Sequence, residues 1–130
     1  MILLDTHVVV WMMLSPELLS NRARDAIVQA RLAGERIASS SVSMYEIARS
    51  AHRRKLKLTS ATEDFIAAVE SRLDWVPLSA GILVRAAELP ETFSGDPFDR
   101  IIAATAIAGD YTLVTYDDRI RKADVCKVLW

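Results

Sequence analysis

Short, wholly apolar segments alternate along the chain with longer segments in which apolar residues recur every three or four positions. A short apolar run between turn residues predicts a buried strand, and the longer spacing predicts a helix with one buried face. The strands that we expect span residues 2–4, 36–40, 75–78, 111–115 and 125–129.

Capping residues mark several of the helices between these strands. Ser20 is a typical N-cap, Ser60 with Glu63 has the spacing of a capping box, and Asp96 precedes Pro97, which suits the first helical position. The helices that we expect span residues 7–14, 20–33, 43 to the basic run at 52–57, 60–73, 79–88 and 96–108.

Strands that alternate with helices predict the α/β class, with a parallel sheet covered on both faces. No repeat, low-complexity tract or linker divides the chain, so we expect a single domain over residues 1–130. Ligands of such sheets bind beyond the carboxyl ends of the strands, where the strand order reverses.

Composition adds few constraints. The hydrophobic fraction of 52% supports a sizeable core, and the net charge of -1 gives no overall basic field for a nucleic acid. Basic runs at 52–57 and 119–122 are either solvated helix ends or local binding patches.

The lone Cys126 excludes a disulfide framework and indicates a reducing, cytoplasmic setting. The apolar first fourteen residues contain Asp5, lack a basic leader and are too short to span a membrane.

Four carboxylates stand out because they interrupt segments that are otherwise apolar or small: Asp5, Glu46, Asp99 and Asp117. Asp5 and Asp117 follow expected strands, whereas Glu46 and Asp99 fall in the expected first turns of helices. A doubly wound sheet would gather all four at the carboxyl edge of its strands.

Each acid also has a plain structural explanation. Ser43 and Glu46 have capping-box spacing, Asp99 lies where the helix dipole favours an anion, and Asp5 and Asp117 could be turn residues. Their joint placement at one edge favours a metal site.

Crowded carboxylates need a hard divalent cation such as Mg²⁺ or Mn²⁺ to offset their repulsion. Such a cation keeps water ligands, binds substrate phosphates and makes a water more acidic, which indicates phosphodiester hydrolysis. The two histidines and one cysteine are too few for a typical zinc site. Thr6, Ser43 and Thr115 are candidate hydrogen-bonding neighbours of the acids, and Arg100 could pair with an acid or contact a phosphate.

Four ordered motifs resemble those of PIN-domain nucleases, most closely the VapC-like toxins of type II toxin–antitoxin systems. They are Leu3-Leu4-Asp5-Thr6-His7-Val8, Ser43-x-x-Glu46-Ile47-Ala48, Asp96-Pro97-Phe98-Asp99-Arg100-Ile101-Ile102-Ala103-Ala104-Thr105-Ala106 and Leu113-Val114-Thr115-x-Asp117. The resemblance implies a three-layer α/β/α sandwich with about five parallel strands, and Mg²⁺- or Mn²⁺-dependent endoribonuclease activity. It also implies a cognate antitoxin and a homodimer.

Carried over by position, the first three family acids fall on Asp5, Glu46 and Asp99, and the fourth falls on Asp117 rather than Asp118. Asp96 is a further acid that part of the family shares, and it is a helix N-cap, an outer metal ligand or both.

Three alternatives remain open at this stage. The first is a PIN-like RNA-processing nuclease without a toxin role, and the second is a PIN-like module that binds a partner without catalysis. The third is a phosphoacceptor signalling domain, which needs an acceptor aspartate after the third strand; residues 75–79 supply none.

Overall fold

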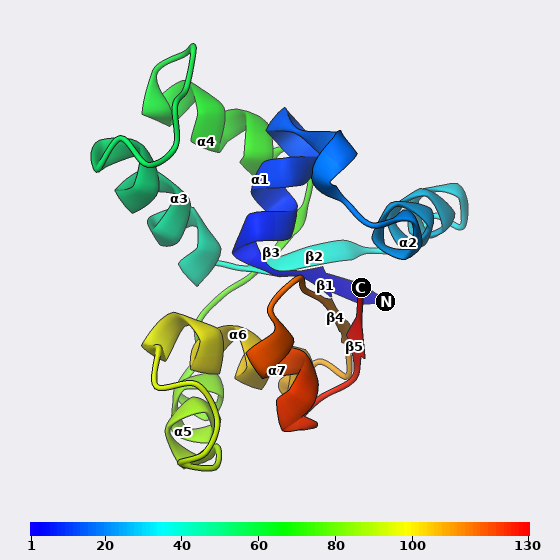
Figure 1. The fold of residues 1–130 in the computed structure, drawn as a ribbon, viewed down its shortest axis with the longest axis vertical. Coiled ribbons are helices and arrows are strands. Elements are labelled where there is room, and N and C mark those ends of the chain that lie inside the picture. The colour runs from blue at the N-terminus through cyan, green and yellow to red at the C-terminus, as the bar shows by residue number, and fades with distance from the viewer.

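Five parallel strands form the central sheet of the computed structural model, which describes residues 1–130 (Figure 1). All four strand pairings are parallel, and the order across the sheet is β3-β2-β1-β4-β5. The strands are β1 (Ile2–Leu4), β2 (Ile37–Ser40), β3 (Asp74–Val76), β4 (Thr112–Val114) and β5 (Val128–Leu129). The expected five-stranded parallel sheet is confirmed.

The strand order reverses at the centre of the sheet. From β1, the chain adds β2 and β3 outward on one side, and β4 and β5 outward on the other. Leu4 at the end of β1 is therefore in register with Ser39 on one side and Val114 on the other. The carboxyl ends of β1 and β4 form the reversal point at which a doubly wound sheet offers a ligand site.

Helices cover both faces of the sheet, as the three-layer sandwich requires (Figure 1). One layer contains α1 (Thr6–Leu14), α2 (Asn21–Leu32), α3 (Val42–His52) and α4 (Thr62–Glu70), with a 3-10 turn over Pro16–Leu18. The other contains α5 (Ala80–Glu88), α6 (Pro97–Ala108) and α7 (Asp118–Ala123). No helix is both long enough and apolar enough to cross a membrane.

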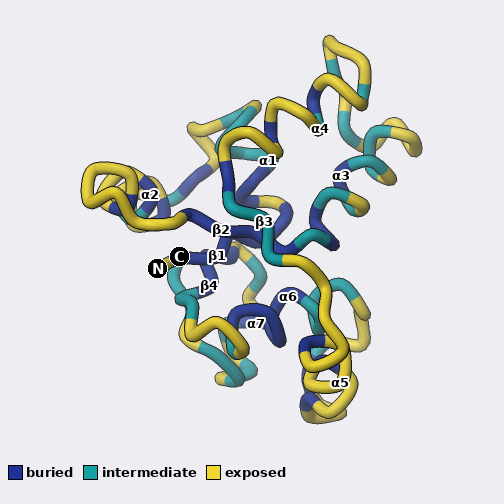
Figure 2. The backbone as a smooth tube through the Cα atoms, turned by 180° about the vertical axis from the view of Figure 1, so that it is seen from behind, coloured by how far each residue is buried: buried dark blue, intermediate teal, exposed yellow.

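Side chains of β1 divide the core into two apolar clusters. Ile2 and Leu4 pack with residues of α1 to α4, whereas Leu3 packs with residues of α6 and α7 on the opposite face. Leu3 and Leu4 are both fully buried, in keeping with the central position of β1 (Figure 2). A strand that is buried on both faces has a continuous apolar sequence, and Ile2–Leu4 has such a sequence.

Local capping chemistry explains the helix starts that the sequence predicts correctly. The Ser20 hydroxyl accepts a hydrogen bond from the Ala23 amide (3.0 Å), and the Asp96 carboxylate accepts one from the Phe98 amide (2.8 Å). Each bond satisfies one of the backbone donors left free in a first helical turn.

The structure corrects three local predictions. The predicted capping box of Ser60 and Glu63 does not form, because Ala61 is the N-cap of α4 and makes no side-chain cap bond. The helix also ends earlier than predicted, at Glu70. Helix α7 was not predicted, because Ile120 is its only buried residue and a single apolar position has no period. Strands β3, β4 and β5 are each shorter than expected.

Candidate functional site

Five carboxylates converge where the strand order reverses, and we call this group, Asp5, Glu46, Asp96, Asp99 and Asp117, the acid site. Asp5 follows β1 and is the N-cap of α1, whereas Asp96 is the N-cap of α6 and Asp99 lies in its first turn. Glu46 lies in the second turn of α3 rather than the first. Asp117 is the N-cap of α7 and lies three residues beyond Val114, the last residue of β4. The acids lie near enough for their charges to influence one another, as expected of acids at one edge, and their role as a site stays a prediction.

Asp5 is the most deeply placed acid, with 5% of its surface exposed. One carboxylate oxygen accepts a hydrogen bond from the Thr6 amide (2.7 Å), and the other accepts one from the Thr115 hydroxyl (2.7 Å). Burial raises the pKa of Asp5, and the two hydrogen bonds act in the opposite direction. The bonds fix the orientation of this carboxylate across β1 and the end of β4.

Glu46 is hydrogen-bonded to the first of two linked hydroxyl groups. Its Oε1 lies 2.6 Å from the Thr6 Oγ1, which is also hydrogen-bonded to the Ser43 hydroxyl at 2.8 Å. Burial raises the pKa of Glu46 to about 7, and the nearby charges of Asp5, Asp96 and Asp99 add to the rise. Helix α3 has Ser41 as its N-cap, so the capping box of Ser43 and Glu46 does not form. Of the three expected hydrogen-bonding neighbours, Thr6 contacts Glu46 and Thr115 contacts Asp5, whereas Ser43 contacts Thr6 and no acid.

Asp99 is held by a serine that the sequence did not single out. The Ser94 hydroxyl donates to Asp99 Oδ2 (2.8 Å) and accepts a hydrogen bond from the Asp96 amide (3.1 Å). Burial raises the pKa of Asp99, and the charges of Asp96, Asp5 and Asp117 raise it further. Ser94 precedes the Gly95–Pro97 turn, and only the folded loop brings it against a side chain five residues later.

Arg100 fixes the loop that carries Ser94. Its guanidinium donates to five backbone carbonyl oxygens, those of Ala86, Ala87, Leu89, Pro90 and Ser94, at 2.6 to 3.4 Å. The prediction that Arg100 would pair with an acid or meet a phosphate is therefore wrong. The planar fork of an arginine suits several carbonyl acceptors at once.

Arg119 places a positive charge inside the acid site. Its guanidinium lies 2.8 Å from Asp117 Oδ2 and 3.5 Å from Asp99 Oδ2. The hydrogen bond from Arg119 lowers the pKa of Asp117, whereas the pKa values of Asp5, Glu46 and Asp99 are raised. Asp118 pairs instead with Arg121, so Asp117 is the member of this adjacent pair that faces the site. The sequence indicated Arg119 only as part of a basic run.

The donor set suits a hard divalent cation. All five groups are carboxylates, the ligand type that Mg²⁺ and Mn²⁺ prefer, and burial and neighbouring acids raise the pKa of Asp5, Glu46 and Asp99. A cation relieves both effects because it stabilises the ionised carboxylates. In the present side-chain conformations, however, no three Asp, Glu, His or Cys side chains form a cluster that could hold a metal ion.

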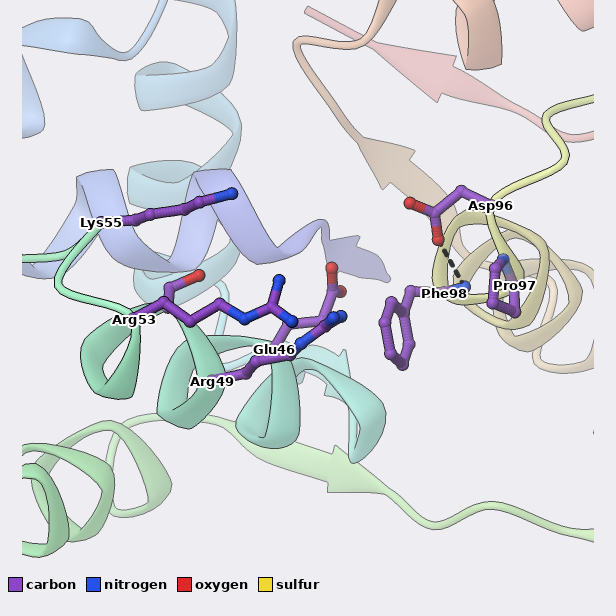
Figure 3. Close-up of a pocket in the computed structure, with 8 residues that line it drawn as sticks. Glu46, Arg49, Arg53, Lys55, Asp96, Pro97 and Phe98 are labelled. Carbon is purple, nitrogen blue, oxygen red and sulfur yellow. Dashed lines mark hydrogen bonds between the residues drawn. The ribbon is translucent and has the colours of Figure 1, made fainter.

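A cavity of about 320 Å³ opens beside the acid site, between α3 and the start of α6 (Figure 3). Three cationic side chains line it on the α3 side, and Pro97 and Phe98 line it on the α6 side. Its charged lining residues are Glu46, Arg49, Arg53, Lys55 and Asp96. Arg53 and Lys55 come from the basic run at 52–57, whereas no motif in the sequence indicated Arg49.

Comparison with known proteins gives one family. The model of the PIN domain matches residues 2–125. Ribonuclease VapC22 of Mycobacterium tuberculosis is 33% identical over 120 residues, which cover 92% of this chain and 89% of that protein.

Solved structures agree on the fold. VapBC2 from Rickettsia felis, bound to a DNA fragment from its promoter, superposes with a TM-score of 0.76 at 21% identity, over 99% of this chain and 98% of the other. A toxin–antitoxin complex from Klebsiella pneumoniae superposes with a TM-score of 0.68 at 19% identity, over 100% and 97% of the two chains. The three-layer fold is thus shared with known proteins.

Proposed function

The chain belongs to the PIN domain family, and from this premise we propose that it is the ribonuclease toxin of a toxin–antitoxin pair, with activity that depends on Mg²⁺ or Mn²⁺. The acid site carries the proposal: carboxylates from four separated segments share one edge of the sheet, Asp5 is buried, and Glu46 and Asp99 are half-buried. Burial and neighbouring acids raise the pKa of these three. A relative of nearly the same length bears the name of a ribonuclease, which supports RNA as the substrate.

We assign the cation to Asp5, Glu46 and Asp99, with Asp117 and Asp96 at the border of the site. A cation bound there would offset the negative charge of the carboxylates. It would also lower the pKa of a bound water, whose deprotonated form could attack phosphorus. Asp5 is preset for this role because its two hydrogen bonds hold both oxygens in place. Preset carboxylates need little reorganisation when charge develops on a phosphate.

Glu46 couples the proposed cation site to pH. With a pKa of about 7, its carboxylate binds a proton near neutrality, and the Thr6 hydroxyl orients Oε1 in either protonation state. A proton and a cation compete for the same carboxylate, since a ligand carboxylate must be ionised. We therefore expect cation affinity to rise with pH through this range.

The test is cleavage of RNA by purified protein. We expect cleavage with Mg²⁺ or Mn²⁺, none with EDTA, and none from Asp5→Asn in any buffer. The matched control is Asp110→Asn, which removes the charge of an exposed aspartate. Asp110 precedes β4 and forms a salt bridge with Lys127. Asp5→Asn protein that cleaves as fast as Asp110→Asn at equal purity would refute the proposal.

The toxin role needs a cellular test. Structural neighbours described as VapBC or toxin–antitoxin complexes support a cognate antitoxin as partner of this chain, and we also propose a homodimer. Expression of the wild-type chain should arrest growth, and Glu46→Gln should not. Growth without arrest, from a protein that cleaves RNA in vitro, would instead indicate a PIN-like RNA-processing nuclease.

A further inference from the structure

The cavity beside Glu46 has one strongly basic wall. Arg49 and Arg53 lie four residues apart on α3 and at its end, and Lys55 follows in the next loop. Figure 3 shows Arg49 and Arg53 reaching along this wall toward Glu46, with Asp96 and Phe98 across the opening. The wall therefore runs directly to the acid site.

These three cations have no anionic partner within the protein. Arg49, Arg53 and Lys55 are exposed, and none takes part in a salt bridge or a side-chain hydrogen bond. By contrast, Arg36 and Arg119 each pair with an aspartate. Free cations that line a cavity, rather than project from a convex surface, are available to a ligand in it.

Phosphate groups fit the chemistry of this wall. The guanidinium fork binds two phosphate oxygens at once, and residues four apart on a helix have Cβ atoms about 5–6 Å apart, so adjacent phosphates can meet adjacent side chains. On the other wall, the Phe98 ring lies 5.7 Å from that of Tyr45, which is exposed. An aromatic surface beside a cationic track is the arrangement that binds single strands without reading their sequence.

We propose that Arg49, Arg53 and Lys55 form a phosphate-binding groove that holds single-stranded RNA on one side of the phosphodiester to be cut. The inference rests on the proposed ribonuclease function and adds the path of the substrate to it. Since the groove contacts phosphates, it contributes affinity and position but no sequence preference.

The test measures binding of a short, labelled, mixed-sequence oligoribonucleotide by fluorescence anisotropy, in EDTA and over a series of salt concentrations. The variant is Arg49→Gln/Arg53→Gln. Its matched control is Arg31→Gln/Arg72→Gln, which removes two exposed arginines from a different pocket, near the starts of β2 and β3. A third protein, Arg49→Lys/Arg53→Lys, keeps the charge.

For single strands, each phosphate contact contributes about 0.7 to the slope of log affinity against log salt, so the variant's slope should be lower by about 1.4. Between about 50 and 200 mM salt the wild type should then lose about sevenfold more affinity than the variant. The control and the lysine protein should keep the wild-type slope, and Lys55→Gln should lower it by about 0.7.

A slope of log affinity against log salt in Arg49→Gln/Arg53→Gln that equals that of the wild type would overturn the groove proposal. So would an equal loss in Arg31→Gln/Arg72→Gln, which would show only a general charge effect. Binding of polyglutamate is measured in the same way. If Arg49→Gln/Arg53→Gln lost polyglutamate binding but kept the wild-type slope for RNA, the groove proposal would also be overturned, because the cavity would then bind an acidic protein segment. Cleavage by the wild type in Mn²⁺ is scored separately, so failure of the nuclease proposal and failure of the groove give different results.

Discussion

Replacing Glu46 with glutamine should stabilise the cation-free protein at alkaline pH. Burial and the charges of Asp5, Asp96 and Asp99 raise the pKa of Glu46 from 4.5 to about 7. Between these values the unfolded chain releases the proton and the folded protein keeps it, so the stability of the wild type falls as pH rises through this interval. Glutamine keeps a carbonyl acceptor for the Thr6 hydroxyl and carries no charge to desolvate.

The size of the effect follows from the pKa of Glu46. One pKa unit corresponds to about 1.36 kcal/mol, which gives an upper value of about 3.4 kcal/mol for complete ionisation. Because the side chain is partly exposed and screened by solvent, we reduce this to about 2 kcal/mol. At about 4 °C per kcal/mol for a chain of this size, the Tm of Glu46→Gln should exceed that of the wild type by about 8 °C at pH 8.

Thermal unfolding in EDTA at several pH values between 4 and 8 measures this difference. We expect similar Tm values for the wild type and Glu46→Gln below the unfolded-state pKa, a gap that widens toward pH 7, and a constant gap above it. Glu17→Gln, at an exposed glutamate, is the control and should follow the wild type. A gap that is independent of pH, or a less stable Glu46→Gln at pH 8, would refute the reasoning.

Three further changes test the supports of the acid site. Thr6→Val removes the hydroxyl shared by Glu46 and Ser43 and should lower the free energy of unfolding in urea by about 1–2 kcal/mol, whereas Thr6→Ser should stay close to the wild type. Arg100→Lys cannot reach five carbonyl oxygens and should lose about 2 kcal/mol in the same assay; unchanged stability would show that these bonds contribute nothing. Arg119→Gln removes the internal counter-charge and should tighten Mn²⁺ binding in calorimetry about twofold to fivefold, so weaker binding would contradict its assigned role.

Much of the fold could be predicted because local and tertiary preferences agree. Ile2–Leu4 is buried on both faces and has a wholly apolar sequence, and Ser20 and Asp96 cap the helices that their positions indicate. The missed helix α7 has one buried residue among charges, so its stability comes from packing Ile120 and from the Asp117 cap rather than from a periodic pattern. The predicted Ser60 and Glu63 box had the right spacing, but Ser60 precedes the true N-cap, Ala61, by one residue, although Glu63 lies in the first turn of α4.

Thr6 and Thr115 were expected as hydrogen-bonding neighbours of the acids, whereas Ser94 and Arg119 were not. Asp5 and Asp99 sit in short motifs with a fixed relation to a strand end or helix start. Arg119 meets Asp99 across 20 residues, and Arg100 meets backbone carbonyl oxygens, which carry no sequence signal. Side-chain identity indicates what a residue can bind, whereas the direction in which it points is set by packing.

Pairing of β1 with β4 has a consequence for synthesis of the chain on the ribosome. The first strand receives its second neighbour only after residues 112–114 are made, and the Thr115 hydroxyl that holds Asp5 is 110 residues away in sequence. Contacts of such long separation form late, so an unfinished chain cannot assemble the acid site. Interrupted translation before Thr112 would release fragments that lack β4, Thr115 and Asp117, and in which Asp5 has one hydrogen-bond donor instead of two.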